Sequence, residues 1–255
     1  MSALLEIAGL RVSLEGREVL HGVSLALEAG AALALVGESG SGKTTLLRAC
    51  LGLLPAGAAV AGSLRWDGRE VLSEGEAGWR RRRGREIAWI PQEPSAALDP
   101  RRTTRALLEE CLRAAGAPDA AQAAPRLLAE VGLPADRGVY PHQWSGGMQQ
   151  RLLIAMALGG RPRLLLADEP TSALDPWRQA DLLALLRRLQ VERGFALLLV
   201  THDLAVAAAA AGTVCVLQRG TIVERGAAAQ VFGRPRTEGA ARLAAAQPRW
   251  PPAPV

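Results

Sequence analysis

Short runs of apolar residues recur along the chain, and each run ends where loop-forming residues begin. The runs are Leu33–Val36, Leu164–Ala167, Ala196–Val200 and Val214–Leu217. Continuous apolar runs of this length are typical of strands that are buried on both faces, as in a parallel sheet. The pattern therefore predicts a buried parallel sheet built from segments that are far apart in the sequence.

Helical patterns separate these predicted strands. Apolar residues occur at helical spacing in Lys43–Leu54, Arg151–Leu158 and Trp177–Arg193, and the last of these has a charged opposite face. Strands that alternate with helices in this way indicate an α/β fold of the doubly wound kind. The opening stretch, Leu4–Leu27, alternates apolar and polar residues around Glu15–Gly16, which predicts an antiparallel hairpin or a small β-sheet.

The middle of the chain has a different pattern. Residues 94–160 contain helical segments broken by proline and glycine and no convincing strand. The predicted helices are Thr104–Ala115, Ala120–Val131 and Gly146–Leu158. We expect one domain over residues 1–247, with an α/β core at 1–93 and 161–226 and an inserted helical subdomain at 94–160. The proline-rich tail, 248–255, is expected to be disordered.

Composition narrows the class of protein. The 255 residues are 49% hydrophobic and 22% charged, as in a globular protein. Cys50, Cys111 and Cys215 stand far apart, which excludes a disulfide framework and most zinc sites and favours a reducing compartment. No apolar run is long enough to span a bilayer, and the N-terminus does not resemble a secretory signal. These features predict a soluble cytoplasmic protein.

The net charge of +5 leaves two interpretations open. The excess is concentrated in Arg80–Arg83, Arg85 and Arg101–Arg102. Such a cluster is typical of a solvated face or a subunit contact, and it also suits binding of phosphate or lipid. Aromatic residues make up only 4% of the chain, which argues against a base-stacking surface for nucleic acid.

The segment LALVGESGSGKTT fits the phosphate-binding pattern G-x-x-x-x-G-K-[ST] between a predicted strand and a predicted helix. Its glycines let backbone N–H groups converge on phosphate oxygens, and the helix that follows presents its positive end to the same anion. Lys43 can reach the β- and γ-phosphates, and the Thr44 hydroxyl can ligate Mg²⁺. A glycine-rich turn of purely structural role is the alternative. The predicted ATP-binding residues of this loop are Gly37, Glu38, Ser39, Gly40, Ser41, Gly42, Lys43, Thr44 and Thr45.

Two acids follow the predicted strand Leu164–Ala167 directly. They emerge at the carboxyl end of the strand, where ligands gather in open α/β sheets. Asp168 is placed to hold Mg²⁺, and Glu169 to orient and deprotonate the attacking water. An Asp-Glu pair can also be an ordinary solvated turn, and the phosphate-binding loop favours the catalytic interpretation.

Further motifs carry a resemblance to a known family. WSGGMQQR (Trp144–Arg151) resembles the LSGGQ signature of the ATP-binding-cassette (ABC) ATPases. In the same order as in that family, Gln92 in IAWIPQEP matches the Q-loop, SALD (Ser172–Asp175) the D-loop, and His202 in LLLVTHDL the switch histidine. The resemblance covers roughly residues 4–226. It implies a RecA-like P-loop NTPase core with an N-terminal antiparallel β subdomain and an inserted helical subdomain.

The resemblance also implies roles for these residues. Ser145, Gly146, Gly147 and Met148 would face the γ-phosphate of an ATP held by an opposing subunit, so that two subunits enclose two ATP molecules. His202 would contact the γ-phosphate, and Asp175 would act in the D-loop. Mg²⁺ would be held by Thr44, Gln92 and Asp168. Taken alone, the signature could be a capped helix and the histidine a structural residue.

Longer runs narrow the resemblance to a subfamily. IAWIPQEPSAALDP and YPHQWSGGMQQRLLIAMAL resemble the ATPases of dipeptide, oligopeptide and nickel importers. HGVSLALEAG and LGLLPAG, with no long cysteine-containing C-terminal extension, are most similar to the nickel-importer ATPase. Trp144 and Met148 depart from the common signature, and Leu14 replaces an adenine-stacking aromatic, which predicts looser base selectivity.

The implied protein is an ATP-hydrolysing subunit of an importer of nickel, metal chelate or peptide. Its expected partners are a second, non-identical ATPase subunit, two membrane permease subunits and a separate solute-binding protein, with no nucleic acid. It would lie peripherally on the cytoplasmic face of the inner membrane. The alternatives are an accessory ATPase of the carbon–phosphorus lyase type and an ABC protein of nucleic acid or ribosomes, which typically needs two cassettes or a long coiled coil.

Overall fold

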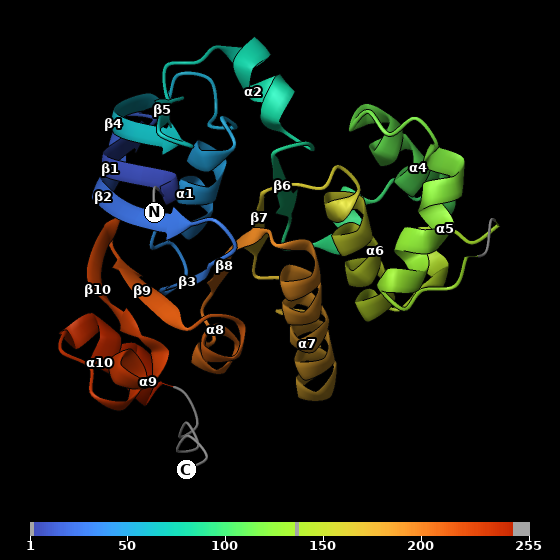
Figure 1. Cartoon of the computed structure of the whole chain (residues 1–255). Helices are drawn as coiled ribbons and strands as arrows, with labels where there is room; N and C mark the ends of the chain where they lie inside the picture. Colours follow the sequence, from blue (N-terminus) through green and yellow to red (C-terminus); the bar gives the residue numbers. More distant parts are fainter. Residues whose placement is uncertain (1–2, 136–137, 247–255) are drawn as a thin grey trace. The chain divides into compact units, whose positions relative to one another are not determined.

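The computed structural model of the chain describes residues 3–135 and 138–246 (Figure 1). The predicted tail, 248–255, lies outside the described residues. The chain folds into two compact units. The first contains Met1–Arg81 and Ala196–Val255, and the second contains Arg82–Phe195.

The first unit contains the predicted hairpin. Strand β1 (Ala3–Leu14) pairs antiparallel with β2 (Arg17–Glu28) across a turn in which Glu15 and Gly16 both have positive φ angles, 50° and 78°. Positive φ at both central residues matches the right-handed twist of the flanking strands. Strands β4 (Ala59–Trp66) and β5 (Arg69–Glu70) extend this sheet in the order β2-β1-β4-β5. The hairpin prediction is confirmed, whereas β4 and β5 were not predicted.

Buried strands form the other sheet of this unit. β3 (Ala32–Val36) lies between β8 (Ala196–Thr201) and β9 (Thr213–Gln218), parallel to both, and β10 (Thr221–Ala227) joins β9 antiparallel. The predicted runs at 33–36, 196–200 and 214–217 are therefore confirmed as strands of a parallel sheet. Helices of the unit are α1 (Lys43–Cys50), α8 (Leu204–Ala210), α9 (Ala228–Gly233) and α10 (Glu238–Ala245), with α2 (Glu76–Arg82) at its border.

The predicted end of the first helix is wrong by one turn. The pattern predicted Lys43–Leu54, but α1 ends at Cys50. Gly52 adopts φ = 62°, and a Cβ there would lie 2.4 Å from the indole ring of Trp79. The left-handed conformation of Gly52 follows the end of the helix. A glycine is needed there because the close approach of Trp79 leaves no room for a side chain.

The second unit is mostly helical. Strand β6 (Ile87–Ile90) pairs parallel with β7 (Leu164–Asp168), which confirms the predicted strand at 164–167. The helices are α3 (Pro94–Ala97), α4 (Thr104–Ala114), α5 (Ala120–Glu130), α6 (Gly146–Leu158) and α7 (Pro176–Arg193), with a 3₁₀ turn at Pro141–Gln143. The longer helices agree with their predictions within one residue at each end. Among the described residues between 94 and 160 there is no strand, as predicted.

The compact units do not coincide with the predicted boundaries. The second unit extends from Arg82 to Phe195 and so includes β6, β7 and α7 in addition to the helices of 94–160. The division into a core and a subdomain at 94 and 160 stays a prediction. Within the described part of the chain, no helix is both long and apolar enough to cross a membrane.

Candidate functional site

The phosphate-binding loop begins where β3 ends, and close contacts with the rest of the first unit fix its path. A Cβ at Gly37 would lie 2.3 Å from the carbonyl oxygen of Leu217 and 2.7 Å from Oγ of Ser41. Gly40 and Gly42 have φ angles of 76° and 105°, which side chains rarely tolerate. All three glycines are therefore required by geometry. The loop can bring its backbone N–H groups close to an anion because no side chain intervenes.

Lys43 lies folded over this loop. The residue is only 6% exposed, and its Nζ donates hydrogen bonds to the carbonyl oxygens of Gly37 at 2.8 Å and Glu38 at 2.9 Å. The ammonium group is thereby positioned over the turn that the glycines form. A cation at this place, beside the N-terminus of α1, complements a polyphosphate.

Two contacts brace the loop from outside. The N–H of Gly220, in the β9–β10 turn, donates to the carbonyl of Ser41 at 2.9 Å, and the N–H of His21 on β2 donates to the carbonyl of Gly220 at 2.9 Å. Neither Gly220 nor His21 was predicted from the sequence as a site residue. The glycine of the Arg219–Gly220 turn was the only available signal, and it did not indicate what the turn contacts.

The switch histidine follows the strand next to the loop. Val36, the last residue of β3, pairs with Thr201, the last residue of β8. Gly37 and His202 therefore emerge from neighbouring strands at the same edge. Oγ1 of Thr201 accepts from the N–H of Asp203 at 3.0 Å, and His202 itself is exposed. The strand pairing brings His202 to the end of the sheet where the loop begins.

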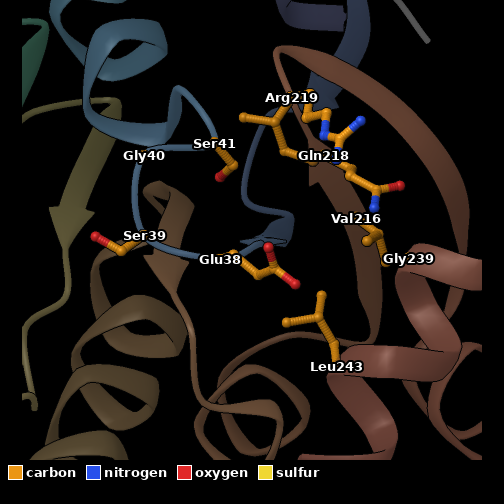
Figure 2. A pocket seen from close by; sticks show the side chains of 10 residues that line it. Glu38, Ser39, Gly40, Ser41, Val216, Gln218, Arg219, Gly239 and Leu243 are labelled. Atoms are coloured by element: carbon orange, nitrogen blue, oxygen red, sulfur yellow. The ribbon is translucent and has the colours of Figure 1, made fainter.

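A small cavity lies on the outer side of the loop (Figure 2). Its volume is about 80 Å³. Its walls come from the loop, from β9 and the turn after it, and from α10; they are Glu38, Ser39, Gly40, Ser41, Val216, Leu217, Gln218, Arg219, Gly239 and Leu243. Helix α10 therefore lies across this cavity from the loop.

In the second unit, the candidate carboxylates follow β7. Ile90 of β6 pairs with Ala167 of β7, so the residues after each strand emerge side by side. Nε2 of Gln92 donates to Oε2 of Glu169 at 3.3 Å, and Asp168 is buried. The structure brings Gln92 and Glu169 together directly. Gln92 is a predicted Mg²⁺ ligand, and its contact with Glu169 was not predicted from the sequence.

Glu169 has a strained backbone. Its φ is 44°, an uncommon value for a residue with a side chain. Its carbonyl accepts hydrogen bonds from the N–H of Ser172 at 3.2 Å and from the hydroxyl of Ser172 at 3.1 Å. The following turn therefore holds the strained residue in place. Strain that the surroundings maintain is frequent at functional sites.

The signature segment begins α6 in the same unit. Oγ of Ser145 accepts from the N–H of Met148 at 3.4 Å, so the serine is the N-cap of the helix. The side chain of Gln149 donates to the carbonyl oxygens of Pro141 at 2.9 Å and Trp144 at 3.1 Å, which fixes the preceding turn. Trp144, the departure from the family pattern, is buried. The tryptophan therefore packs in the core and is not presented to a ligand.

The D-loop lies beside the signature. A Cβ at Gly147 would lie 3.8 Å from Leu174 and 3.9 Å from Arg178. Asp175 caps α7 by accepting from the N–H of Arg178 at 3.0 Å, and it also forms an ion pair with that side chain. This structural role accounts for an aspartate at the position independently of catalysis.

The chemistry of the predicted Mg²⁺ ligands fits the ion. The hydroxyl of Thr44, the amide oxygen of Gln92 and the carboxylate of Asp168 are hard oxygen donors, which Mg²⁺ prefers. In the first unit, the glycines beside Thr44 leave space for phosphate oxygens, which are also ligands of Mg²⁺ in nucleotide-binding proteins. Among the described residues, no group of three or more His, Cys, Asp or Glu side chains forms another metal site.

Known proteins are similar to this chain in sequence. The model of the ABC transporter family matches residues 20–172. The peptidoglycan transport ATP-binding protein YejF of Agrobacterium fabrum is 43% identical over 90% of this chain and 44% of its own length. The dipeptide transport ATP-binding protein DppD of Lactococcus lactis is 40% identical over 86% of this chain and 65% of its own. The glutathione import ATP-binding protein GsiA of Salmonella typhimurium is 40% identical over 96% and 42%. The chain thus spans from about two fifths to two thirds of the length of these relatives.

Solved structures share the fold. CbiO1 of Clostridium perfringens, described as part of the transporter complex CbiONQ, superposes with a TM-score of 0.79 at 23% identity over 92% of each chain. The ATP-binding cassette MJ0796, in a dimeric structure bound to ADP and Pi, gives a TM-score of 0.75 at 26% identity over 88% of this chain and 98% of that one.

Proposed function

This chain belongs to the ABC transporter family, and on that premise we propose that it is the ATP-hydrolysing subunit of an importer of peptides or peptide-like molecules. The observation that carries the proposal is the pair Gln92–Glu169 at the ends of β6 and β7, in a chain that also has a complete phosphate-binding loop. A glutamate whose carboxylate is held by an amide is suited to orienting a water molecule in a nucleotide-hydrolysing protein.

Each predicted residue has a role in this proposal. The loop residues 37–45 hold the phosphates of ATP, with Lys43 as their counter-charge. Thr44, Gln92 and Asp168 hold Mg²⁺, which neutralises phosphate charge when it is bound. Glu169 accepts the proton of the attacking water, and His202 contacts the γ-phosphate.

The remaining predicted residues act across a subunit interface. Ser145–Met148 and Asp175 complete the ATP site of an opposing subunit, so two ATPase subunits are needed for full turnover. This proposal is supported by the exposed N-cap Ser145, which the chain does not cover with its own described residues, and by the similarity to MJ0796, whose structure is dimeric. We propose that the opposing subunit is a different chain and not a second copy of this one.

The names of the relatives support a peptide cargo. YejF, DppD and GsiA are named for transport of peptidoglycan, dipeptide and glutathione. Nickel or a metal chelate, which the sequence resemblance favoured, stays a prediction that these names do not support. The proposed assembly also contains two permease subunits and a solute-binding protein, with this chain on the cytoplasmic face of the inner membrane.

Uptake measurements can test this function. The gene for this chain is deleted from its source organism, and uptake of a labelled tripeptide and of labelled nickel is measured in parallel. Loss of tripeptide uptake alone, restored by the wild-type chain but not by Glu169→Gln, is the expected result. Loss of nickel uptake alone contradicts the peptide cargo. If neither changes, and no polytopic membrane protein copurifies with the chain, the accessory-ATPase alternative is favoured.

A further inference from the structure

The carboxylate of Glu224 fastens the start of the C-terminal helix. Glu224 lies on β10 and is only 9% exposed. The N–H of Arg236 donates to both of its carboxylate oxygens, at 3.1 and 3.0 Å. The N–H and the hydroxyl of Thr237 donate to Oε2 at 3.0 and 2.9 Å. Hydrogen bonds to an ionised carboxylate are stronger than neutral ones, so this cluster holds the chain firmly just before α10.

Thr237 connects the carboxylate of Glu224 to the helix. The threonine is the N-cap of α10, and its Oγ1 accepts from the N–H of Ala240 at 3.3 Å. The same hydroxyl therefore donates to Glu224 and caps the helix. The position of the first turn of α10 is set by the carboxylate on β10.

The anchored helix packs behind the phosphate-binding loop. Ala240 and Leu243 of α10 belong to the same buried cluster as Val36, the residue directly before Gly37. Figure 2 shows Leu243 pointing toward the cavity that Glu38 and Ser41 line from the other side. α10 therefore supports both the strand that leads into the loop and the outer side of the loop.

Gly239, the second residue of the helix, lies against the side chain of Gln218. A Cβ at Gly239 would lie 2.5 Å from Oε1 of Gln218, the last residue of β9. Gln218 precedes the Arg219–Gly220 turn, and the N–H of Gly220 donates to the carbonyl of Ser41. A displacement of α10 would thus reach the loop by two routes, through Val36 and through the β9–β10 turn.

We propose that Glu224 is a positioning residue for nucleotide binding, because it holds α10 against the back of the phosphate-binding loop. This inference rests on the proposed binding of ATP. Glu224 does not touch the nucleotide; it maintains the shape of the loop, so its loss weakens binding and leaves the chemical step at saturating ATP unchanged.

A matched pair of variants tests the inference. Glu70 on β5 has a similar arrangement, since its carboxylate accepts from the N–H groups of Leu64 at 3.1 Å and Leu72 at 3.0 Å and from the hydroxyl of Ser63. The dissociation constant of a fluorescent ATP analogue is measured for the full chain, Glu224→Gln and Glu70→Gln, together with their melting temperatures. We expect Glu224→Gln to raise the dissociation constant by about fivefold or more, a typical size for coupling between distant sites, and Glu70→Gln to leave it unchanged.

The outcomes separate this inference from the proposed function. If the wild-type chain does not bind the analogue, the proposed function fails and the inference fails with it. If the wild type binds and Glu224→Gln binds equally well, only the inference fails. An equal loss of affinity in Glu70→Gln would show general loosening of the unit, which also overturns it. Turnover with the partner subunits should show a raised KM for ATP and an unchanged kcat.

A second pair keeps the test valid if Glu224→Gln does not fold. Thr237→Val leaves Glu224 intact and removes the hydroxyl that joins the carboxylate to α10, whereas Thr103→Val removes the hydroxyl that caps α4 in the second unit. We expect weaker binding of the analogue for Thr237→Val and wild-type binding for Thr103→Val. Equal binding by both variants contradicts the inference.

Discussion

Two loops of this chain begin helices beside glycines, and they are held in different ways. The phosphate-binding loop begins α1 at Gly42, which has no side chain to cap the helix, and Lys43 is buried in the turn. The signature segment begins α6 at Ser145, whose own hydroxyl caps the helix, and Ser145 and Gly146 are exposed. The first helix therefore has no side-chain cap at its start, whereas the second has a serine cap that accepts one of its N–H groups.

This difference indicates that the first loop binds an anion alone and that the second acts together with another molecule. A loop whose shape is fixed by surrounding strands and whose cation is built in can hold an anion alone. An exposed, self-capped helix start gains most when another molecule supplies the phosphate and excludes water. We therefore expect this chain to bind nucleotide by itself and to hydrolyse it slowly until an opposing subunit is present.

The largest expected effect is on the rate of hydrolysis, and it is independent of nucleotide binding by either loop. Glu169→Gln should retain nucleotide binding and lower turnover by about 10²–10⁴-fold, because it removes the proposed base and keeps the side-chain shape. Turnover is measured with the partner subunits present. Glu192→Gln, on the exposed face of α7, is the matched control and should hydrolyse ATP like the wild type. Equal rates in the two variants would exclude Glu169 as the base.

Two cysteines report how tightly α1, the helix after the phosphate-binding loop, is packed in comparison with α4. Burial raises the pKa of the Cys50 thiol in α1 from its ordinary value of 9.0 to about 12. At neutral pH its thiolate fraction is then lower by about 10³-fold, and the thiolate is the reactive form. Cys111 in α4 is only partly buried. We expect a thiol reagent to label Cys111 first and Cys50 only on unfolding, as peptide mapping by mass spectrometry can show. Early labelling of Cys50 would mean that α1 opens readily.

The same packing explains which elements the sequence could predict. Runs such as Leu164–Ala167 are buried on all sides and leave an unmistakable apolar pattern. Strand β4 is mostly exposed over its first half and contains Gly62 at φ = 103°, so it shows no alternation. β6 was also missed, although its four residues are as apolar as the run Leu164–Ala167; it lies at the edge of its sheet. Local pattern is informative where burial is uniform and uninformative at the edge of a sheet.

The candidate site divides in the same way. The loop residues were predictable because a contiguous motif carries them, and the structure gives each glycine a geometric reason. The Gln92–Glu169 hydrogen bond, the φ of 44° at Glu169 and the support of Ser41 by Gly220 were not predictable. They depend on which strands are neighbours, and a spacing of 77 residues between Gln92 and Glu169 contains no such information.

A smaller effect tests whether the first loop is self-sufficient. Lys43→Ala should weaken nucleotide binding to the isolated chain by roughly 10- to 100-fold, the size expected for losing hydrogen bonds from a charged group. Titration calorimetry with ATP and Mg²⁺ measures it. Arg48→Ala, at an exposed position one turn further along α1, is the control and should bind like the wild type. Undiminished binding by Lys43→Ala would mean that the glycines and the helix suffice.

The smallest expected effect concerns the second loop and decides the comparison. Ser145→Ala removes the N-cap of α6 and should cost about 1 kcal/mol of unfolding free energy, as measured by urea denaturation. Because the serine does not belong to the phosphate-binding loop of its own chain, we expect unchanged nucleotide affinity in the isolated chain and reduced turnover after the opposing subunit is added. Asp203→Ala, which removes the N-cap of α8, is the control for the loss of a cap. If Ser145→Ala weakened binding in the isolated chain as much as Lys43→Ala does, both loops would be acting on one nucleotide, and the proposed division between them would be wrong.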